Sequence, residues 1–502
     1  MPTGGTQWMR QVRESGLTRR DVLRGGAVAA GVLAAGAIAP STAVAATRRS
    51  PHDARVVVIG AGLAGLTCAY RLARRGVQVQ LFEARQDRVG GRCWSARDFA
   101  GGQVAEHGGE FVDTRHVHLL RLARSLGLKL DDSEKLRPKG VKGIVAIKGE
   151  VRTSAELGKN LPRVLRRLAA DARRIGPYRY DRAGRAARAF DELSVADWLH
   201  ANVPGGRSSL LATRIADGAA GFWGGDPEDL SAINLIEQYL APYEGADERW
   251  IIHGGNDQVP NLLAERLPEG TVQLATPLEA VRRAGRGYEL RFTGLADPVT
   301  ADFVVFALPF TTLRDVDLSH AGLSARKRAA IEHHGMGTNA KVLLQFDRKF
   351  AKFHRWSGSL STDDPRWGSW DSTVGDGGAE SLLTIFSGGS AGAGYPAERS
   401  HGPAPEAVVK ASLDWLDRHV PGIAGAYNGH SWLDSWADDP WVHGSYATFA
   451  PGQYTRYWGY SKLPEGRLHF AGEHTSTHSQ GYLNGGVESG ERAAKEILAA
   501  LG

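Results

Sequence analysis

The first regular hydrophobic pattern of the chain begins at residue 55. Residues 55–59 form a continuous β-branched run, which is typical of a strand that is buried on both faces. Apolar residues then recur at helical spacing over 66–73, and this pattern stops at Gly76. A second apolar run covers residues 77–82. The pattern therefore predicts two parallel strands joined by a helix.

The middle of the chain changes from strand patterns to helical ones. Residues 116–245 carry Leu, Ala and Arg at helical spacing, as at Leu161, Val164 and Leu168, which predicts a mostly helical region. The many arginines of this region are most simply the solvated face of its helices: Arg166, Arg167, Arg173, Arg174, Arg182, Arg185 and Arg188. Further strands are predicted at 272–274 and 277–281, residues 301–309 indicate a buried strand that leads to a turn, and an apolar strand is predicted around 340–344.

The C-terminal segment repeats the strand, turn and helix order of the first one. Residues 467–475 indicate a strand that ends in a turn, and the glycine-rich segment 481–490 opens the last helix. Such a turn offers backbone N–H groups and a helix N-terminus to an electron-rich acceptor. We therefore expect both ends of the chain to contribute to one ligand site.

The first fifty residues have a different composition. A twin-arginine motif at 18–23 is followed by an Ala/Gly-rich apolar run at 27–39 and by small residues at 41–46. This order predicts a Tat export signal over residues 1–46, and thus a periplasmic or extracellular protein that meets the Tat machinery. A disordered or membrane-anchoring N-terminus is the alternative. The run is shorter than the roughly 20 residues that a membrane span needs, so we expect no stable membrane insertion.

Charge and cysteine content exclude some classes of protein. The 502 residues have a formal net charge of +6, and the predicted signal contributes five Arg against Glu14 and Asp21. The weak remaining charge is spread out, which does not indicate a nucleic-acid partner. The two cysteines, Cys68 and Cys93, are expected to be free thiols. No His/Cys cluster has metal-ligand spacing, and His116 and His118 are interpreted as surface residues.

The first turn carries a dinucleotide-binding motif. Gly60, Gly62 and Gly65 stand between the first strand and the first helix, and Glu83 ends the second strand. Gly60 permits the tight turn, Gly62 allows close approach of a diphosphate, and Gly65 allows the helix to pack on the strand. Glu83 is placed to accept hydrogen bonds from ribose hydroxyls.

Two further segments resemble one family. The segment 89–92 (Val-Gly-Gly-Arg) and the segment 106–111 (Glu-His-Gly-Gly-Glu-Phe) resemble the flavin-containing amine oxidases, which include monoamine, polyamine and L-amino-acid oxidases. The resemblance covers most of residues 54–500 in patches, and it implies FAD as the cofactor of a bacterial enzyme. The residues that it implies for FAD binding, together with the first motif, are Gly60, Gly62, Leu63, Ala64, Gly65, Glu83, Ala84, Arg85, Gly91, Arg92, Gly108, Gly109, Glu110, Phe111, Leu278, Trp436, Gly472, Glu473, Gly481, Tyr482 and Leu483.

The resemblance also implies four catalytic residues. Lys341, at the start of an apolar strand, corresponds to the lysine that holds a water against the flavin. Trp436 corresponds to a tryptophan that packs on the flavin, and Tyr446 and Tyr482 to an aromatic cage around the substrate nitrogen. Ser445 stands where animal monoamine oxidases attach the flavin through cysteine, so FAD is expected to be non-covalent. No metal is needed.

The fold class expected is α/β with two domains. A Rossmann-like FAD-binding domain with a parallel sheet would comprise 51–115, 246–320 and 462–502, and a substrate domain of mixed sheet and helices would comprise 116–245 and 321–461. The expected reaction is oxidation of a primary or secondary amine, including diamines and polyamines, to an imine, with dioxygen reduced to hydrogen peroxide. The oligomeric state, monomer or homodimer, stays open.

Three alternatives stay open at this point. An L-amino-acid oxidase would usually carry a carboxylate-binding arginine where Phe111 stands, unless Arg115 supplies it. Asp113 and Glu110 lie near the place where polyamine oxidases carry an ammonium-binding carboxylate, although an acidic loop or helix cap explains Asp113 equally well. A flavin desaturase or isomerase, and a flavin-fold binding protein, share the FAD motifs.

Overall fold

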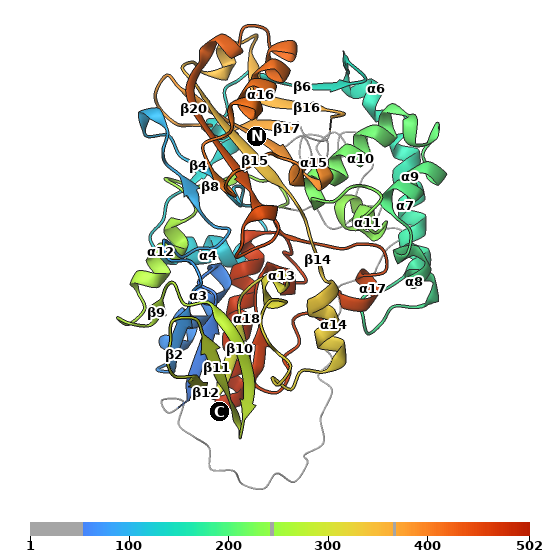
Figure 1. Ribbon diagram of the computed structural model, residues 1–502. Coiled ribbons are helices and arrows are strands. Elements are labelled where there is room, and N and C mark those ends of the chain that lie inside the picture. Colours follow the sequence, from blue (N-terminus) through green and yellow to red (C-terminus); the bar gives the residue numbers. More distant parts are fainter. Residues whose placement is uncertain (1–53, 241–244, 365–367) are drawn as a thin grey trace.

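Five parallel strands form the centre of the nucleotide-binding half of the computed structural model, which describes residues 54–240, 245–364 and 368–502 (Figure 1). Their order across the sheet is β22, β13, β1, β2, β9. The strands comprise β22 (Leu468–Phe470), β13 (Phe303–Phe306), β1 (Arg55–Ile59), β2 (Gln78–Phe82) and β9 (Val272–Gln273). The first predicted strand is confirmed at both bounds, whereas the second begins one residue later than predicted. The buried strand predicted within 301–309 is β13, and the rest of that segment leaves the sheet after Phe306.

The two ends of the described chain pack against each other on this sheet. Helix α3 (Leu63–Ala73) lies beside the last helix, α18 (Leu483–Leu501), as the blue and red ribbons of Figure 1 show. A Cβ added at Gly490 would come 2.3 Å from the carbonyl oxygen of Ala64, so only glycine permits this helix contact. The other helices of this half are α4 (Val117–Ser125), α12 (Gln258–Glu265), α13 (Phe310–Leu313) and α14 (Ala325–His333).

Helix α4, which falls within the segment predicted for the substrate domain, packs against α18. The backbone N–H of Leu119 donates to Oδ1 of Asn484 at 2.9 Å, and His118 pairs with Glu491 at 2.8 Å, both on α18. The strands of the parallel sheet all come from the three segments predicted for the FAD-binding domain. The domain bounds themselves stay a prediction.

A three-stranded antiparallel sheet lies beside the parallel one. It consists of β10 (Leu278–Ala284), β11 (Gly287–Phe292) and β12 (Val299–Ala301). Phe292 of this small sheet stacks on Phe82 of β2 with ring centroids 4.2 Å apart. The contact brings the start of β10 next to the end of β2.

The second half is built on an eight-stranded mixed sheet. Its order is β19 (His401–Gly402), β20 (Tyr427–Ser435), β15 (Ala340–Phe346), β18 (Ser381–Ser387), β17 (Gly368–Asp371), β16 (Trp356–Thr362), β6 (Lys142–Ile147) and β7 (Glu150–Val151). Only β16 and β6 run parallel to each other, and every residue of the central strand β15 is buried. Helix α16 (Glu406–His419) contributes Trp415 and Leu416 to the apolar core beside this sheet.

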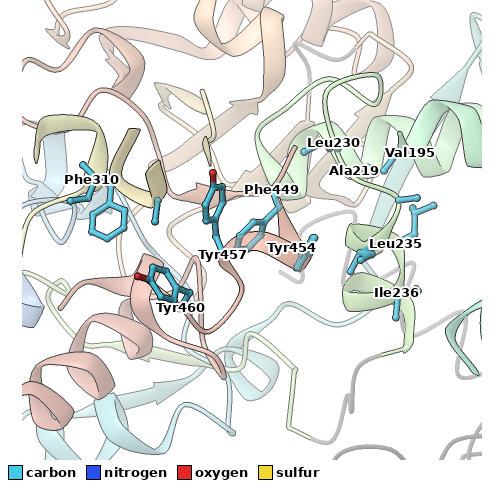
Figure 2. Close-up of a cluster of buried hydrophobic side chains, with 14 of the residues drawn as sticks. Val195, Ala219, Leu230, Leu235, Ile236, Phe310, Phe449, Tyr454, Tyr457 and Tyr460 are labelled. Atoms are coloured by element: carbon cyan, nitrogen blue, oxygen red, sulfur yellow. The ribbon is translucent and has the colours of Figure 1, made fainter. Parts of the chain in front are cut away.

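A group of helices extends from one end of this sheet, as the right side of Figure 1 shows. They are α6 (Ser154–Gly158), α7 (Leu161–Ile175), α8 (Arg185–Asp191), α9 (Val195–Asn202), α10 (Leu210–Trp223) and α11 (Ile233–Leu240). Leu161, Val164 and Leu168 are buried on α7, while the seven arginines named above are all exposed, which confirms the predicted apolar and solvated faces. In Figure 2, Val195 and Leu235 of these helices belong to one cluster with Phe449 and Tyr454.

The remaining described strands and α-helices are short. They are β3 (Ser95–Ala96), β4 (Ala105–Glu106), β5 (Leu130–Asp132), β8 (Trp250–Ile252), β14 (Gly335–Met336), β21 (Ala447–Thr448), α5 (Ser133–Leu136), α15 (Gly389–Ala393) and α17 (Tyr454–Tyr457). Cys68 and Cys93 are buried free thiols, which confirms the expectation. Within the described residues, no helix is both long and apolar enough to cross a membrane. The predicted export signal, residues 1–46, lies outside them.

Candidate active site

A large cavity opens at the carboxyl ends of the parallel strands, where ligands of such sheets bind. It spans about 1350 Å³ of space, part of it open to solvent. The predicted cofactor residues on its wall are Gly60, Gly62, Leu63, Ala64, Glu83, Ala84, Arg85, Gly91, Arg92, Gly109, Leu278, Gly472, Glu473, Gly481, Tyr482 and Leu483. The structure thus brings together segments from both ends of the chain.

Other predicted site residues do not line this cavity as the described residues define it. They are Gly65, Gly108, Glu110, Phe111, Lys341 and Trp436. Gly65 and Gly108 have packing roles instead. An added Cβ would lie 1.9 Å from the carbonyl oxygen of Gly60 at Gly65, and 2.0 Å from that of Arg92 at Gly108. Both glycines therefore let backbone segments of the site approach each other.

The first glycine turn has the geometry that its motif requires. Gly60 has φ +97°, a left-handed conformation that favours glycine, and its N–H donates to the carbonyl of Phe82 at 2.7 Å. Gly62 is different, because the nearest atom to an added Cβ is the carbonyl oxygen of Gly90 at 3.9 Å. The space at Gly62 belongs to the cavity, as expected for close approach of a diphosphate.

Glu83 is fixed at the end of β2. Its Oε2 accepts from the backbone N–H of Ala61 at 2.7 Å, and its Oε1 accepts from that of Arg85 at 2.9 Å. The carboxylate is 8 % exposed and lines the cavity. The motif glutamate therefore joins the glycine turn to the second strand.

Arg92 joins the N-terminal and C-terminal motifs. Its Nη1 donates to Oε1 of Glu473 and to the carbonyl of Ser445, both at 2.8 Å. Glu473 in turn accepts from the backbone N–H of Gly481 through Oε2 at 2.7 Å and from that of Ala447 through Oε1 at 3.1 Å. The buried carboxylate of Glu473 thus links three segments of the cavity wall, at Arg92, Ala447 and Gly481.

Lys341 is the second residue of the buried strand β15 and is 4 % exposed. Its Nζ donates to the carbonyl of Glu106 at 2.8 Å and to Oε2 of Glu110 at 3.0 Å. Oε1 of Glu110 accepts from the indole N–H of Trp370 at 2.9 Å. An ammonium has three donors, so one N–H of Lys341 is left for a further acceptor such as a water. The sequence identified the lysine, and Glu110 as a cofactor residue, but not the ion pair between them.

We expect Glu110→Gln to lower the free energy of unfolding by about 3 kcal/mol, because removal of one partner leaves a buried charge without compensation. Urea denaturation measures this change. The variant Lys341→Met in the Glu110→Gln background should recover most of the loss, since neither charge is then buried. An unfolding free energy of Glu110→Gln equal to that of the original chain would contradict the assigned ion pair.

Tyr446 and Tyr482 both lie on the cavity wall. The hydroxyl of Tyr446 donates to the carbonyl of Phe222 at 3.0 Å, and its ring comes 3.6 Å from the position of a Cβ added at Gly481. Burial raises the pKa of both phenols, which stay neutral at physiological pH. The two tyrosines therefore form a neutral, largely desolvated wall.

Trp436 lies behind the second glycine pair. Its indole N–H donates to the carbonyl of His107 at 3.0 Å, and its Cζ2 is 3.4 Å from the position of a Cβ added at Gly108. Ser445 stands at the position where related enzymes attach the flavin through cysteine. Its hydroxyl donates to Oδ1 of Asn339 at 2.6 Å. Cys93 lines the cavity, but its thiol donates to the carbonyl of Asn256 at 3.3 Å and burial raises its pKa.

Asp113 has the structural role that was the alternative to substrate binding. Its Oδ2 accepts from Nε of Arg115 at 3.0 Å, and its Oδ1 accepts from the backbone N–H of Glu248 at 2.8 Å. Burial raises its pKa, although Arg115 opposes this effect. The carboxylate of Asp113 therefore fixes the loop that contains Glu248.

Phe111 packs on Trp370 with ring centroids 5.7 Å apart.

The expectation that His116 is a surface residue is wrong. It is 1 % exposed, its Nδ1 accepts from the backbone N–H of Asp113 at 2.9 Å, and its ring lies 4.7 Å from that of Tyr482. Burial lowers its pKa to about 3, so it is a neutral imidazole. A Thr-Arg-His sequence has no local pattern that predicts burial, because the ring that packs on His116 belongs to Tyr482, far along the chain.

A buried polar network lies next to Trp436 and was missed entirely from the sequence. Asp434 and Asp439 are fully buried, and His401 lies between them, with Nδ1 2.8 Å from Oδ1 of Asp434 and Nε2 2.8 Å from Oδ2 of Asp439. Nδ1 of His107 is 2.9 Å from Oδ2 of Asp434. Arg85 forms an ion pair with Asp439.

This network makes stability depend on pH in both directions. Burial raises the pKa of the two aspartates, but the histidines and Arg85 outweigh it and hold both pKa values low. Burial lowers the pKa of His401, but its two carboxylate partners outweigh it and raise that pKa. The aspartates therefore stabilise the fold above about pH 4 and His401 does so below about pH 6.5, so their joint contribution is largest between those values.

We expect the network to raise the midpoint of urea denaturation most between about pH 4 and pH 6.5. It should fall on the acid side as Asp434 and Asp439 protonate, and on the alkaline side as His401 loses its proton. Urea denaturation of the original chain and of Asp439→Asn over pH 3–9 measures the effect. The same pH profile in both proteins would contradict it.

A glycine-lined cavity at the carboxyl ends of a parallel sheet, with two neutral phenols on its wall, is typical of one class of protein, the nucleotide-dependent oxidoreductases with a Rossmann-type domain. The model of one family, the flavin-containing amine oxidoreductases, matches residues 63–498. The chain belongs to this family, and the reaction class is therefore flavin-dependent oxidation of amines.

Sequence similarity to known relatives extends over nearly the whole chain. The chain is 27 % identical over 483 residues to the flavin-containing monoamine oxidase AofH of Mycobacterium tuberculosis, covering 91 % of this chain and 99 % of that protein. It is 27 % identical over 496 residues to the flavin-containing amine oxidase A of Canis lupus familiaris, covering 90 % and 86 %.

Solved structures show the same fold. Putrescine oxidase bound to putrescine superposes with a TM-score of 0.76, and cyclohexylamine oxidase from Brevibacterium oxydans superposes with 0.77. Each is 24 % identical to this chain, covering 89 % of it and 99 % of the other chain. The predicted fold class, with a parallel-sheet half and a half of mixed sheet and helices, is confirmed.

Proposed function

We propose that this protein holds FAD without a covalent bond and oxidises a primary or secondary amine, diamines and polyamines included, to an imine, with dioxygen reduced to hydrogen peroxide. The observation that carries the proposal is the pair Tyr446 and Tyr482 on the wall of the same cavity that Gly62, Glu83 and Arg92 line. Two aromatic walls exclude water and accept the apolar carbon next to an amine nitrogen.

The residues present fit FAD. The open space at Gly62 suits a diphosphate, the carboxylate of Glu83 suits ribose hydroxyls, and the N-terminus of α3 faces the same cavity. The C-terminal turn lines the same cavity at Gly472 and Tyr482, and the N-terminus of α18 begins directly after it. Ser445 has no thiol to form a thioether, which supports a non-covalent cofactor.

The side chains around the cofactor have separate roles. When bound, FAD supplies the hydride acceptor and later the electron donor to dioxygen. The tyrosine pair orients the amine and disfavours its charged form, because the cavity wall there is desolvated. Lys341 holds a water with the N–H that Glu106 and Glu110 leave available.

Three observations bear on the substrate class. Relatives and structural neighbours include monoamine, putrescine and cyclohexylamine oxidases, which supports amines of varied length. Phe111 and Trp370 form an apolar contact where an amino-acid oxidase would place its arginine, which argues against an L-amino acid. Arg115 lies with its guanidinium carbon 5.9 Å from the ring centroid of Tyr482, so L-amino acids stay the second candidate.

A substrate panel tests the proposal. Purified holoenzyme is mixed in air with monoamines, diamines, polyamines and L-amino acids, and hydrogen peroxide is measured. We expect peroxide with at least one amine and much less with L-amino acids. Peroxide with L-amino acids alone would favour the second candidate, and none with any member of the panel would contradict the proposal.

Export by the Tat pathway to the periplasm or the extracellular space is part of the proposal, and the motif Thr18-Arg19-Arg20-Asp21-Val22-Leu23 supports it. Replacement of Arg19 and Arg20 by lysine should leave folded, flavin-containing protein inside the cell. Equal amounts outside the cell for both sequences would contradict this part alone.

A further inference from the structure

The turn that carries Trp436 is held at both of its ends by one side chain. Asp434 is the eighth residue of β20 and Asp439 follows the short helical turn of Trp436, and His401 of β19 reaches both. The His401 ring also meets the Trp436 ring at 66° with centroids 4.6 Å apart. His401 therefore closes a loop of six residues around the tryptophan.

The hydrogen bonds of His401 define its charge. A carboxylate only accepts hydrogen bonds, so each ring nitrogen that faces one must carry a proton. Both nitrogens of His401 lie 2.8 Å from aspartate oxygens, and its side chain is 8 % exposed. A neutral imidazole would direct a lone pair at one of these buried carboxylates. The geometry thus requires an imidazolium.

The surrounding charges agree with that assignment. The charged and titratable groups that face the network are Asp434, Asp439, Arg85, Arg88, His107 and His401. The indole N–H of Trp432 also donates to Oδ1 of Asp434 at 3.0 Å. Arg85 and the His401 imidazolium balance the two aspartates. Arg88 lies outside this group of four residues. Its guanidinium carbon is 4.1 Å from the ring centroid of Trp94, and Trp94 stacks on His107.

The network connects the two ends of the proposed FAD site. At one end Arg85, which lines the cavity, donates its backbone N–H to Glu83, the proposed ribose ligand. At the other end Trp436 donates to the carbonyl of His107, directly before the second glycine pair. His401 stands between them, contacts the ring of Trp436 and does not line the cavity.

On the basis of the proposed FAD site, we propose that His401 is a positioning residue whose imidazolium, bound to Asp434 and Asp439, sets the Trp436 turn for the flavin ring. The adenosine end keeps its own contacts, the ion pair of Arg85 with Asp439 and the hydrogen bond of Arg85 to Glu83, without His401. A general packing role would weaken both ends together. A positioning role predicts that ligands with and without the flavin ring respond differently.

The experiment compares FAD and ADP as probes of the purified apoprotein by calorimetry. His401→Gln should weaken FAD binding by about 10- to 100-fold, which corresponds to one or two lost charged hydrogen bonds, and change ADP binding by less than about 2-fold. His419→Gln on α16, remote from the network, is the matched control and should change neither. An equal loss of FAD and ADP affinity in His401→Gln would overturn the proposal.

A second measurement does not depend on the folding of that variant. Nitrogen-15 NMR of histidine-labelled apoprotein at pH 7 should show both ring nitrogens of His401 protonated, with the signal identified by its shift in Asp439→Asn. An unprotonated ring nitrogen in the original chain would overturn the proposal. If the original chain binds neither FAD nor ADP, the proposed function fails, whereas binding of both with an equal response in His401→Gln refutes only the role of His401.

Discussion

Replacement of Lys341 by methionine is expected to slow the reoxidation of the reduced holoenzyme by dioxygen by about 100-fold, the lower range for loss of a positioned proton-transfer group. Methionine keeps the length and apolar volume of the side chain but removes all three N–H donors. Reduction by an amine should change little, because the tyrosine wall that receives the substrate is intact. Stopped-flow absorbance of the flavin measures the two half-reactions separately.

Lys341→Met also removes the partner of Glu110, which could disturb the site by itself. The double variant Lys341→Met with Glu110→Gln is therefore the matched control, since it buries neither charge. Slow reoxidation in both variants assigns the effect to the lost ammonium. A reoxidation rate equal to that of the original enzyme in either variant would remove the role assigned to Lys341.

Two neighbouring glycines should respond in opposite ways to the same substitution. Gly62→Ala should leave the thermal stability of the apoprotein nearly unchanged, because the nearest atom to its Cβ is 3.9 Å away and its φ of −73° suits alanine. The added methyl occupies the cavity, so FAD affinity should fall by about 100-fold through the lost approach of the diphosphate. Calorimetric FAD titration and apoprotein melting measure both quantities.

Gly65→Ala should instead destabilise the apoprotein itself by about 3 kcal/mol or prevent folding, because its Cβ would lie 1.9 Å from the carbonyl oxygen of Gly60. The packing of α3 on β1 has to open to accept it. A stable Gly65→Ala apoprotein, or a Gly62→Ala protein with unchanged FAD affinity, would contradict the distinct roles of the two positions.

The local patterns predicted the nucleotide half well. The strand at 55–59, the helix after Gly62 and the strand that ends at Phe82 follow from a buried β-branched run, a glycine turn and helical spacing, all within thirty residues. The eight-stranded sheet was not predicted in its order, because β6 pairs with β16 more than 200 residues away. Register between such remote strands leaves no signature in either segment.

The same distinction applies to the site. Gly60, Gly62, Glu83 and Arg92 belong to short motifs with fixed spacing, and the structure places all four on one cavity wall. Lys341 was found only through the family resemblance. Its partner Glu110 was predicted to bind the cofactor, and the ion pair between the two residues was not predicted.

His401, by contrast, has no motif. Its role depends on two aspartates 33 and 38 residues further along the chain, which folding brings within hydrogen-bond distance. Buried polar networks of this kind are specified by tertiary contacts, so a single sequence cannot reveal them.

Anaerobic mixing of the holoenzyme with an amine is the decisive measurement of flavin-dependent amine oxidation. We expect that the absorbance of oxidised FAD is lost without oxygen, that air restores it, and that one hydrogen peroxide is released for each flavin reoxidised. Trichloroacetic acid should release the FAD from the precipitated protein, as a non-covalent cofactor requires. Flavin absorbance that stays unchanged with every monoamine, diamine and polyamine tested would contradict the account.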